Sequence, residues 1–173
     1  MTDVHVSWDE YHKKTEELAV KVNSDGWKFN QVVCIAKGGM RVGDVFARLF
    51  NVPLAILSVE SYKGGGSKKD ERGSVIFSRE LAKTTPDLGS KVLLVDDLAD
   101  SGITLKKSID WLQHIYGFYL DEPIRTAVIY YKSVSNYEPD YYIDYLKNSP
   151  WIHFPYEKYE GLNIKELKKN IEK

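Results

Sequence analysis

Residues 92–105 read Val92-Leu93-Leu94-Val95-Asp96-Asp97-Leu98-Ala99-Asp100-Ser101-Gly102-Ile103-Thr104-Leu105. The four apolar residues at the start predict a buried strand, which we expect to end at the adjacent acids Asp96 and Asp97. A turn with a third acid, Asp100, follows, and the small and hydroxylic residues after it are typical of a helix start. A strand that passes through a turn into a helix indicates an α/β fold with a parallel sheet.

The helix start at Ser101–Thr104 is suited to bind a phosphate group. The first backbone N–H groups of a helix have no partner within the helix, and the helix dipole favours negative charge there. Asp96 and Asp97 would repel a phosphate, but their anionic oxygens suit sugar hydroxyls or a divalent metal ion. The segment therefore predicts adjoining sites for a sugar and for its phosphate.

A second strand, turn and helix lies earlier in the chain. Residues 32–36 form a continuous apolar run, the pattern of a central strand, and a helix is expected over residues 42–50. Each of the two expected helices should bury one apolar stripe, formed here by Val45, Phe46 and Leu49 and in the later helix by Leu105, Ile109, Leu112 and Ile115. Between this strand and its helix, Gly38-Gly39 lets the backbone turn tightly and approach a ligand, while Lys37 and Arg41 add positive charge. This loop is a candidate site for a second anionic group.

Two further strands are expected over residues 54–59 and 126–131. Four strands would then end at charged residues, namely Lys37, Glu60, Asp97 and Lys132. In open α/β sheets, ligands bind at the carboxyl ends of the strands. We therefore expect one binding site along this edge of the sheet.

Two segments lack the pattern of regular elements, within what we expect to be a single domain over residues 1–173. Residues 60–75 are rich in glycine and charge, and Val75-Ile76-Phe77 then returns as if to close a hairpin, which predicts a flexible lid. Residues 133–160 are dense in aromatic residues and interrupted by prolines, which predicts a small C-terminal hood of irregular segments over the sheet edge.

Composition narrows the functional classes. The net charge of −1 favours neither nucleic acid nor a membrane surface as a partner. The single cysteine, Cys34, lies in an apolar run, which indicates a buried thiol and a reducing, cytoplasmic location. The four histidines show no metal-ligand spacing, so they are assigned no metal role.

The stretch from Val92 to Thr104 resembles the ribose-phosphate signature of the type I phosphoribosyltransferases. That signature is an apolar run, two acids, two intervening residues and then Asp-Thr-Gly-x-Thr, and here Ser101 replaces the first threonine. The Lys37-Gly38-Gly39 loop is similar to the family's pyrophosphate loop. Residues 151–157, Trp-Ile-His-Phe-Pro-Tyr-Glu, resemble the base-binding segment of the bacterial and archaeal xanthine-guanine (hypoxanthine) members.

The resemblance implies the type I phosphoribosyltransferase fold, a mostly parallel sheet flanked by helices, with a lid hairpin and a hood. It also implies an enzyme of purine salvage, which transfers a 5-phosphoribosyl group from phosphoribosyl pyrophosphate to N9 of a 6-oxopurine: guanine, xanthine or hypoxanthine. The implied cofactor is Mg²⁺, and the implied assembly is a homo-oligomer, either a dimer or a tetramer.

Roles for single residues follow from the same resemblance. Asp100 would accept a proton from N7 of the base, Asp96 and Asp97 would hold the sugar side of the substrate, and Asp96 would also bind the metal. The 5′-phosphate would be bound by residues at the helix start: Asp100, Ser101, Gly102, Ile103 and Thr104. Pyrophosphate would be bound by Lys37 and Gly38, with Ser61 and Tyr62 in the lid. The base would be bound by Lys132, Trp151 and Ile152, and the Lys132 ammonium would favour a carbonyl at C6 over an amino group.

Three alternatives remain open from the sequence. A non-catalytic regulator could keep the fold and sense phosphoribosyl pyrophosphate, although it would usually need an added DNA-binding module or a basic face. A phosphoribosyltransferase for adenine, uracil or orotate would share the central motif and differ in the hood. A receiver-type sheet protein also carries acids at its strand ends, but it would not explain Gly38-Gly39 or the lid.

Overall fold

The structure, a computed structural model, describes residues 3–61 and 75–172. Its elements in chain order are β1 (Val4–His5), α1 (Trp8–Ser24), β2 (Gln31–Ala36), α2 (Met40–Phe50), β3 (Leu54–Ser61), β4 (Val75–Phe77), β5 (Ala82–Lys83), β6 (Val92–Ala99), α3 (Ile103–Tyr116), the 3₁₀ turn η1 (Gly117–Tyr119), β7 (Arg125–Lys132), β8 (Tyr141–Leu146), β9 (Ile152–His153), α4 (Lys158–Gly161) and α5 (Ile164–Ile171).

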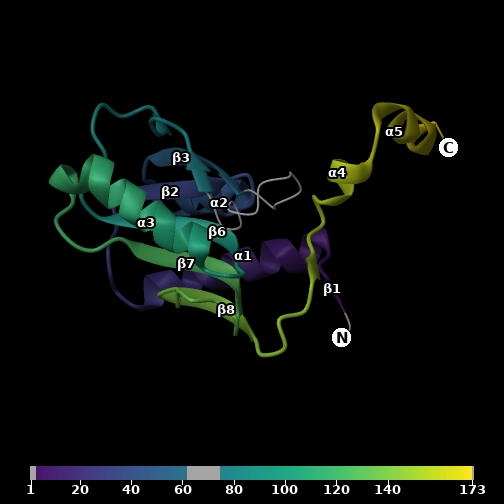
Figure 1. The fold of residues 1–173 in the computed structure, drawn as a ribbon, viewed down its shortest axis with the longest axis horizontal. Helices are drawn as coiled ribbons and strands as arrows, with labels where there is room; N and C mark the ends of the chain where they lie inside the picture. Colours follow the sequence, from purple (N-terminus) through teal and green to yellow (C-terminus); the bar gives the residue numbers. More distant parts are fainter. Residues whose placement is uncertain (1–2, 62–74, 173) are drawn as a thin grey trace, which may run out of the picture.

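The main sheet has the strand order β4-β3-β2-β6-β7-β8, and β5 also pairs with β3. Its neighbours β3, β2, β6, β7 and β8 run parallel, whereas β4 and β5 are antiparallel to β3. Strands β1 and β9 form a separate parallel pair. Figure 1 shows α3 across the sheet, and α4 and α5 extending away from it at the C-terminal end. The expected α/β fold with a mostly parallel central sheet is confirmed.

Both faces of the sheet are covered, which explains the continuous apolar runs in its strands. Val32 and Cys34 of β2 pack into the core formed with α1 and α2, whereas Val33 and Ile35 pack into the core formed with α3. The alternation follows from the two-residue period of a strand. Burial raises the pKa of the Cys34 thiol to about 12, which agrees with a packing role for this residue.

The direction in which successive strands are added to the sheet reverses between β2 and β6. These strands are parallel neighbours, but β2 leads through α2 to β3 on one side, and β6 leads through α3 to β7 on the other. The loops after β2 and β6 therefore leave the sheet in opposite directions and open a crevice between them. Crevices of this kind bind ligands in open α/β sheets.

Three expectations about element boundaries need correction. Strand β6 does not end at Asp97 but continues to Ala99, because its ladder with β7 extends to the pair Ala99 and Tyr131. Residues 133–160, expected to be irregular, include β8, which continues the main sheet beside β7. Of the expected lid, Glu60 and Ser61 belong to β3 and Val75 to β4, and these strands pair as a hairpin. Tyr62 and the rest of the lid lie outside the described residues.

Helices α2 and α3 bury one stripe each, but the stripes are narrower than the sequence suggests. Leu49 of α2 is 62% exposed and Ile115 of α3 is 45% exposed, although both were expected to face inward. Tyr116, next to Ile115, is buried instead. Apolar residues on the flank of a short amphipathic helix reach the solvent once the central stripe fills the contact.

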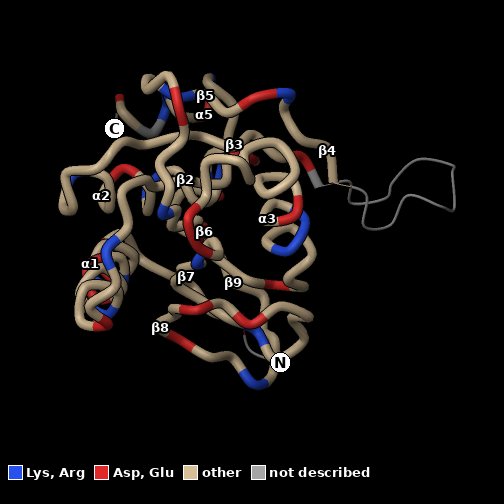
Figure 2. Tube along the Cα trace, turned by 90° about the vertical axis from the view of Figure 1, so that its left-hand side faces the viewer, with Lys and Arg blue, Asp and Glu red and all other residues tan. Residues whose placement is uncertain are grey.

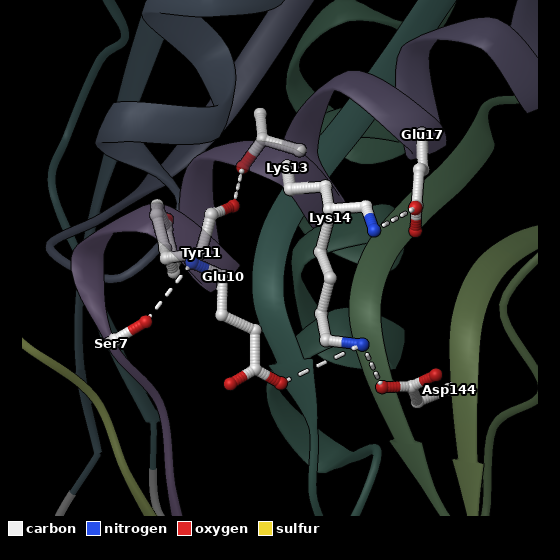
Figure 3. Close-up of polar contacts among 8 residues, drawn as sticks. Ser7, Glu10, Tyr11, Lys13, Lys14, Glu17 and Asp144 are labelled. Atoms are coloured by element: carbon white, nitrogen blue, oxygen red, sulfur yellow. Dashed lines mark hydrogen bonds and ion pairs between the residues drawn. The ribbon is translucent and has the colours of Figure 1, made fainter.

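Helix α1 is tied to the far edge of the sheet by Lys14. The Lys14 ammonium lies 2.6 Å from Asp144 of β8 and 3.8 Å from Glu10 one helical turn away, as Figure 3 shows. At the start of α1, the Ser7 hydroxyl accepts a hydrogen bond from the Glu10 backbone N–H. Among the described helices, none combines the length and the hydrophobicity that crossing a lipid bilayer requires.

The contact between α2 and β2 yields a stability prediction. A Cβ added to Gly43 would lie 2.6 Å from the Cβ of Cys34, so Gly43→Ala should force α2 away from the sheet. We expect the free energy of unfolding to fall by about 1–3 kcal/mol in urea titrations. The control is Gly117→Ala, since no heavy atom of the described residues lies in the space that a Cβ would occupy there, and its φ is −55°. Equal stability of the two variants would contradict this packing.

Candidate active site

A cleft of about 780 Å³ lies at the carboxyl ends of β2 and β6. It brings together five residues predicted from the sequence: Lys37, Gly38, Asp96, Asp97 and Thr104. Figure 2 shows acidic positions on the trace beside the β6 label. The topological crevice is therefore also the place where the predicted sugar site and anion loop meet.

The two glycines of the β2 loop allow it to approach β6. A Cβ on Gly39 would lie 2.5 Å from the Val95 carbonyl oxygen, and one on Gly38 would lie 2.5 Å from Asp97 Oδ2. A side chain at Gly39 would therefore clash with the backbone of β6, and a side chain at Gly38 would clash with the Asp97 carboxylate. Their joint effect is to place Lys37 beside the acid pair.

At the carboxyl end of β6, Asp96 is buried and Asp97 is half-buried. Burial is the largest cause of a raised pKa at Asp96, and the neighbouring charge of Asp97 raises it further. Burial likewise raises the pKa of Asp97, while hydrogen bonds, first from Tyr156, lower it. The Asp97 backbone N–H also donates to Asp96 Oδ1 at 3.0 Å. Because two neighbouring negative charges are unfavourable in a desolvated site, these carboxylates favour a cation or hydroxyl donors as ligands.

A smaller cavity of about 70 Å³ adjoins the cleft and is lined by the loop between β6 and α3. Asp100, Ser101, Gly102 and Thr104 contribute to its wall, and Ile103 is the first residue of α3. Within the described chain, α3 has no acidic residue in its first turn and no side-chain cap on Gly102. The N-terminus of α3 therefore presents its positive dipole end to this small cavity, where negative charge is favoured.

The loop after β7 supports this small cavity, a contact that the sequence did not predict. Gly102 has φ +76°, and a Cβ there would overlap the Ser135 hydroxyl and lie 2.7 Å from the Tyr137 backbone nitrogen. The Asn136 backbone N–H donates to the Ser101 carbonyl at 2.9 Å. Residues 135–137 thus pack behind the loop between β6 and α3, a contact that follows from the pairing of β6 with β7.

Beyond this small cavity, Asp100 meets two predicted base-site residues. Lys132, at the end of β7, is 4% exposed, and its ammonium lies 3.1 Å from Asp100 Oδ1. The same nitrogen lies 5.9 Å from the centre of the Trp151 ring, which is half exposed. The sequence-predicted acid, cation and aromatic ring are therefore neighbours in space.

The third predicted base-site residue, Ile152, is buried in β9. Strand β1 pairs with β9 through the carbonyls of Trp151 and His153, which accept from Val4 and Val6. Because backbone groups alternate in direction along a strand, the N–H and C=O of Ile152 point away from β1. Its backbone is therefore not used by this pairing.

The cleft also contains residues that were not among the predicted site residues, among them Arg41 and Tyr156, which contact each other. Arg41, whose charge near the Gly38-Gly39 loop the sequence did show, lines the cleft, and its guanidinium lies 4.6 Å from the centre of the Tyr156 ring. Tyr156 also lines the cleft and donates a hydrogen bond to Asp97 Oδ2. No local pattern predicts a contact between residues 59 positions apart.

The donor set fits a magnesium ion that is shared with a substrate. Within the described residues, no group of three or more Asp, Glu, His or Cys side chains could enclose a metal ion. Mg²⁺ is commonly held by one or two carboxylates together with substrate phosphates rather than by a cage of protein ligands. Asp96 and Asp97 could supply those carboxylates.

The burial of Asp96 leads to a pH-dependent prediction. Because its pKa is raised in the folded state from the ordinary 3.8, its contribution to stability is present at low pH and is lost as the pH rises. Asp96→Asn should therefore increase the free energy of unfolding by about 1–2 kcal/mol near pH 7 and have little effect near pH 4. The exposed Asp110→Asn of α3 is the control. If Asp96→Asn is less stable than the wild type at neutral pH, the Asp96 charge does not destabilise the folded state as predicted.

Comparisons with known proteins agree with this geometry. Residues 7–160 match the phosphoribosyl transferase domain family. The xanthine-guanine phosphoribosyltransferase of Roseobacter denitrificans is 30% identical over 159 residues, which cover 88% of this chain and 84% of that protein. The Ruegeria sp. protein of the same name is 29% identical over 157 residues, with the same coverage.

Solved structures give the same picture. The purine phosphoribosyltransferase from Pyrococcus horikoshii superposes with a TM-score of 0.72 at 25% identity, over 90% of this chain and 94% of that one. The Helicobacter pylori xanthine-guanine-hypoxanthine phosphoribosyltransferase shares the fold, with a TM-score of 0.74 at 21% identity over 97% and 99% of the two chains. From the matched sequence, the shared fold and the site at the crevice, the chain belongs to the phosphoribosyl transferase domain family.

Proposed function

We propose that this protein transfers the 5-phosphoribosyl group of phosphoribosyl pyrophosphate to N9 of a 6-oxopurine. The products are a purine nucleoside 5′-monophosphate and pyrophosphate. The observation that carries the proposal is the order of sites along one sheet edge: a cation loop, an acid pair, a phosphate cavity and a base site. The substrate has its pyrophosphate, ribose and 5′-phosphate in a matching arrangement, and the names of the curated relatives support a purine as acceptor.

The phosphate and ribose would be held by the β6 end. The 5′-phosphate would enter the cavity at the N-terminus of α3 and meet the backbone of residues 101–104. The ribose hydroxyls would then reach Asp96, which lines both the cavity and the cleft, and Asp97, which lines the cleft. Held at both ends, the sugar cannot rotate away from the incoming base, which lowers the entropy cost of reaction.

The leaving group would be bound by the β2 loop. Lys37 and the backbone at Gly38 lie beside the acid pair, where the pyrophosphate of the bound substrate would extend. A Mg²⁺ ion held with Asp96 and Asp97 would offset the charge on the departing pyrophosphate. Carboxylates close to the anomeric carbon also stabilise the positive charge that develops there in the transition state.

The base would lie between Trp151 and the Asp100–Lys132 pair. The Trp151 ring offers a stacking surface, worth about 1–3 kcal/mol for a base. Lys132 would donate to the C6 carbonyl, the Ile152 backbone would meet another edge of the ring, and Asp100 would accept the N7 proton as N9 bonds to the sugar. Asp100 is 56% exposed at its side chain, so the base can reach it.

The lid and the wider setting complete the proposal. Ser61 and Tyr62 would cover the sugar diphosphate and keep water from the developing cation. We further expect a cytoplasmic homo-oligomer without nucleic-acid or membrane partners. Exposed apolar side chains at Leu49, Phe118 and Ile171 are compatible with subunit contacts, and the near-zero net charge offers no general attraction for polyanions.

One assay tests the function and its alternatives. The protein is incubated with Mg²⁺, phosphoribosyl pyrophosphate and one base at a time, and nucleotide formation is followed by chromatography. We expect product with guanine, xanthine or hypoxanthine, and far less with adenine, uracil or orotate. Product with another base alone would reassign the acceptor. Tight binding of phosphoribosyl pyrophosphate without product from any base would favour the regulator.

The role of Asp100 predicts a selective loss of turnover. Asp100→Asn should lower kcat by about 10²- to 10⁴-fold, because the amide cannot accept the N7 proton. Binding of phosphoribosyl pyrophosphate, measured by calorimetry, should change little. Asp110→Asn on α3, the helix that follows the Asp100 loop, is the control and should retain wild-type kcat. Wild-type turnover in the Asp100 variant would remove this residue from the mechanism.

The role of Lys132 predicts a change in base preference. Lys132→Met removes the ammonium donor, so kcat/KM for 6-oxopurines should fall by about 10- to 100-fold while the weaker activity with adenine falls less. The exposed Lys147→Met, at the end of the neighbouring strand, is the control. An equal loss with every base would show that Lys132 supports the fold rather than selects the carbonyl.

A further inference from the structure

Tyr156 connects the C-terminal segment to the acid pair. It lies between β9 and α4, and its hydroxyl donates to Oδ2 of Asp97 at the end of β6. Both residues line the cleft between β2 and β6. A side chain from the expected hood thus contacts a carboxylate that is proposed to hold the ribose and the metal.

The Tyr156 ring is fixed from several sides. It stacks on Phe154 at 5.3 Å with an interplanar angle of 6°, and it meets the edge of Tyr11 at 5.8 Å and 88°. The Arg41 guanidinium lies over the ring at 4.6 Å, and the Trp8 ring is 5.3 Å from the same guanidinium. Contacts with a stacked ring, an edge and a cation leave the phenol little freedom to turn.

The Asp97 carboxylate is confined on its other side by the pyrophosphate loop. Both carboxylate oxygens lie within 2.6 Å of the position that a Cβ of Gly38 would take, so the group is packed over that glycine. A buried carboxylate is costly unless hydrogen bonds hold it. Here a rigid phenol supplies such a bond, and the carboxylate sits between Tyr156 and the loop that carries Lys37.

We propose that Tyr156 is a positioning residue, which holds the Asp97 carboxylate in the orientation that receives the sugar diphosphate. This inference rests on the proposed function. A carboxylate that is already oriented binds without paying for its own reorganisation, and a carboxylate that is free to rotate must be ordered by the ligand. Tyr156 acts through Asp97 and touches no reacting atom.

The test is Tyr156→Phe, which removes the hydroxyl and keeps the ring with its stacking. The KM for phosphoribosyl pyrophosphate should rise by about tenfold, with kcat and the KM for the base within about threefold of wild type. Tyr130→Phe is the matched control: Tyr130 is buried on β7, and its hydroxyl has no partner among the described residues. That control should keep the wild-type KM.

Repeating the substitution in an Asp97→Ala variant distinguishes a positioning role of Tyr156 from a general packing role. In Asp97→Ala, the phenol has no carboxylate to orient, so adding Tyr156→Phe should leave the affinity for phosphoribosyl pyrophosphate, measured by calorimetry, unchanged within about twofold. An equal loss with and without Asp97, or wild-type or tighter binding by Tyr156→Phe alone, would overturn the inference. If the wild-type protein forms no nucleotide, the proposed function fails, and the calorimetric cycle still decides whether Tyr156 acts through Asp97.

Discussion

Two adjacent carboxylates held inside the edge of a parallel sheet are the constraint on which this structure depends. Asp96 and Asp97 lie on β6, where the strand still pairs with β7, and burial raises the pKa of both. Such an arrangement destabilises the folded state unless hydrogen bonds or a cation compensate for the buried charge. Neighbouring features lessen the cost: backbone hydrogen bonds at Asp97, the Tyr156 hydroxyl, and two glycines that let the β2 loop come close.

The strand order of the sheet places a second loop opposite these carboxylates. Because β2 and β6 are adjacent and their loops leave in opposite directions, a cation-bearing loop and an acidic loop face each other without any long insertion. The N-terminus of α3 then supplies a third, electropositive feature beside them. Three kinds of electrostatic environment thus lie next to one another, as the three parts of a phosphorylated sugar diphosphate would require.

The local elements of the site could be predicted from the sequence. Residues 92–105 predicted a strand that leads through an acidic turn into a helix. The glycine loop and Lys132 could be assigned to strand ends because apolar runs stop there. The relations between distant segments could not be predicted. The contact of Tyr156 with Asp97, the support of Gly102 by residues 135–137 and the place of β8 in the sheet all depend on which strands become neighbours. Periodicity also overestimated burial at Leu49 and Ile115, since it cannot tell the centre of a helix face from its flank.

We expect the end of β6 to bind the ribose while the start of α3 binds its phosphate. A crystal structure with a purine nucleoside 5′-monophosphate would show both contacts at once. The phosphate should lie against the backbone of residues 101–104, the ribose hydroxyls on Asp96 and Asp97, and the base between Trp151 and Lys132. A nucleotide bound at another place, with this pocket empty, would contradict this arrangement.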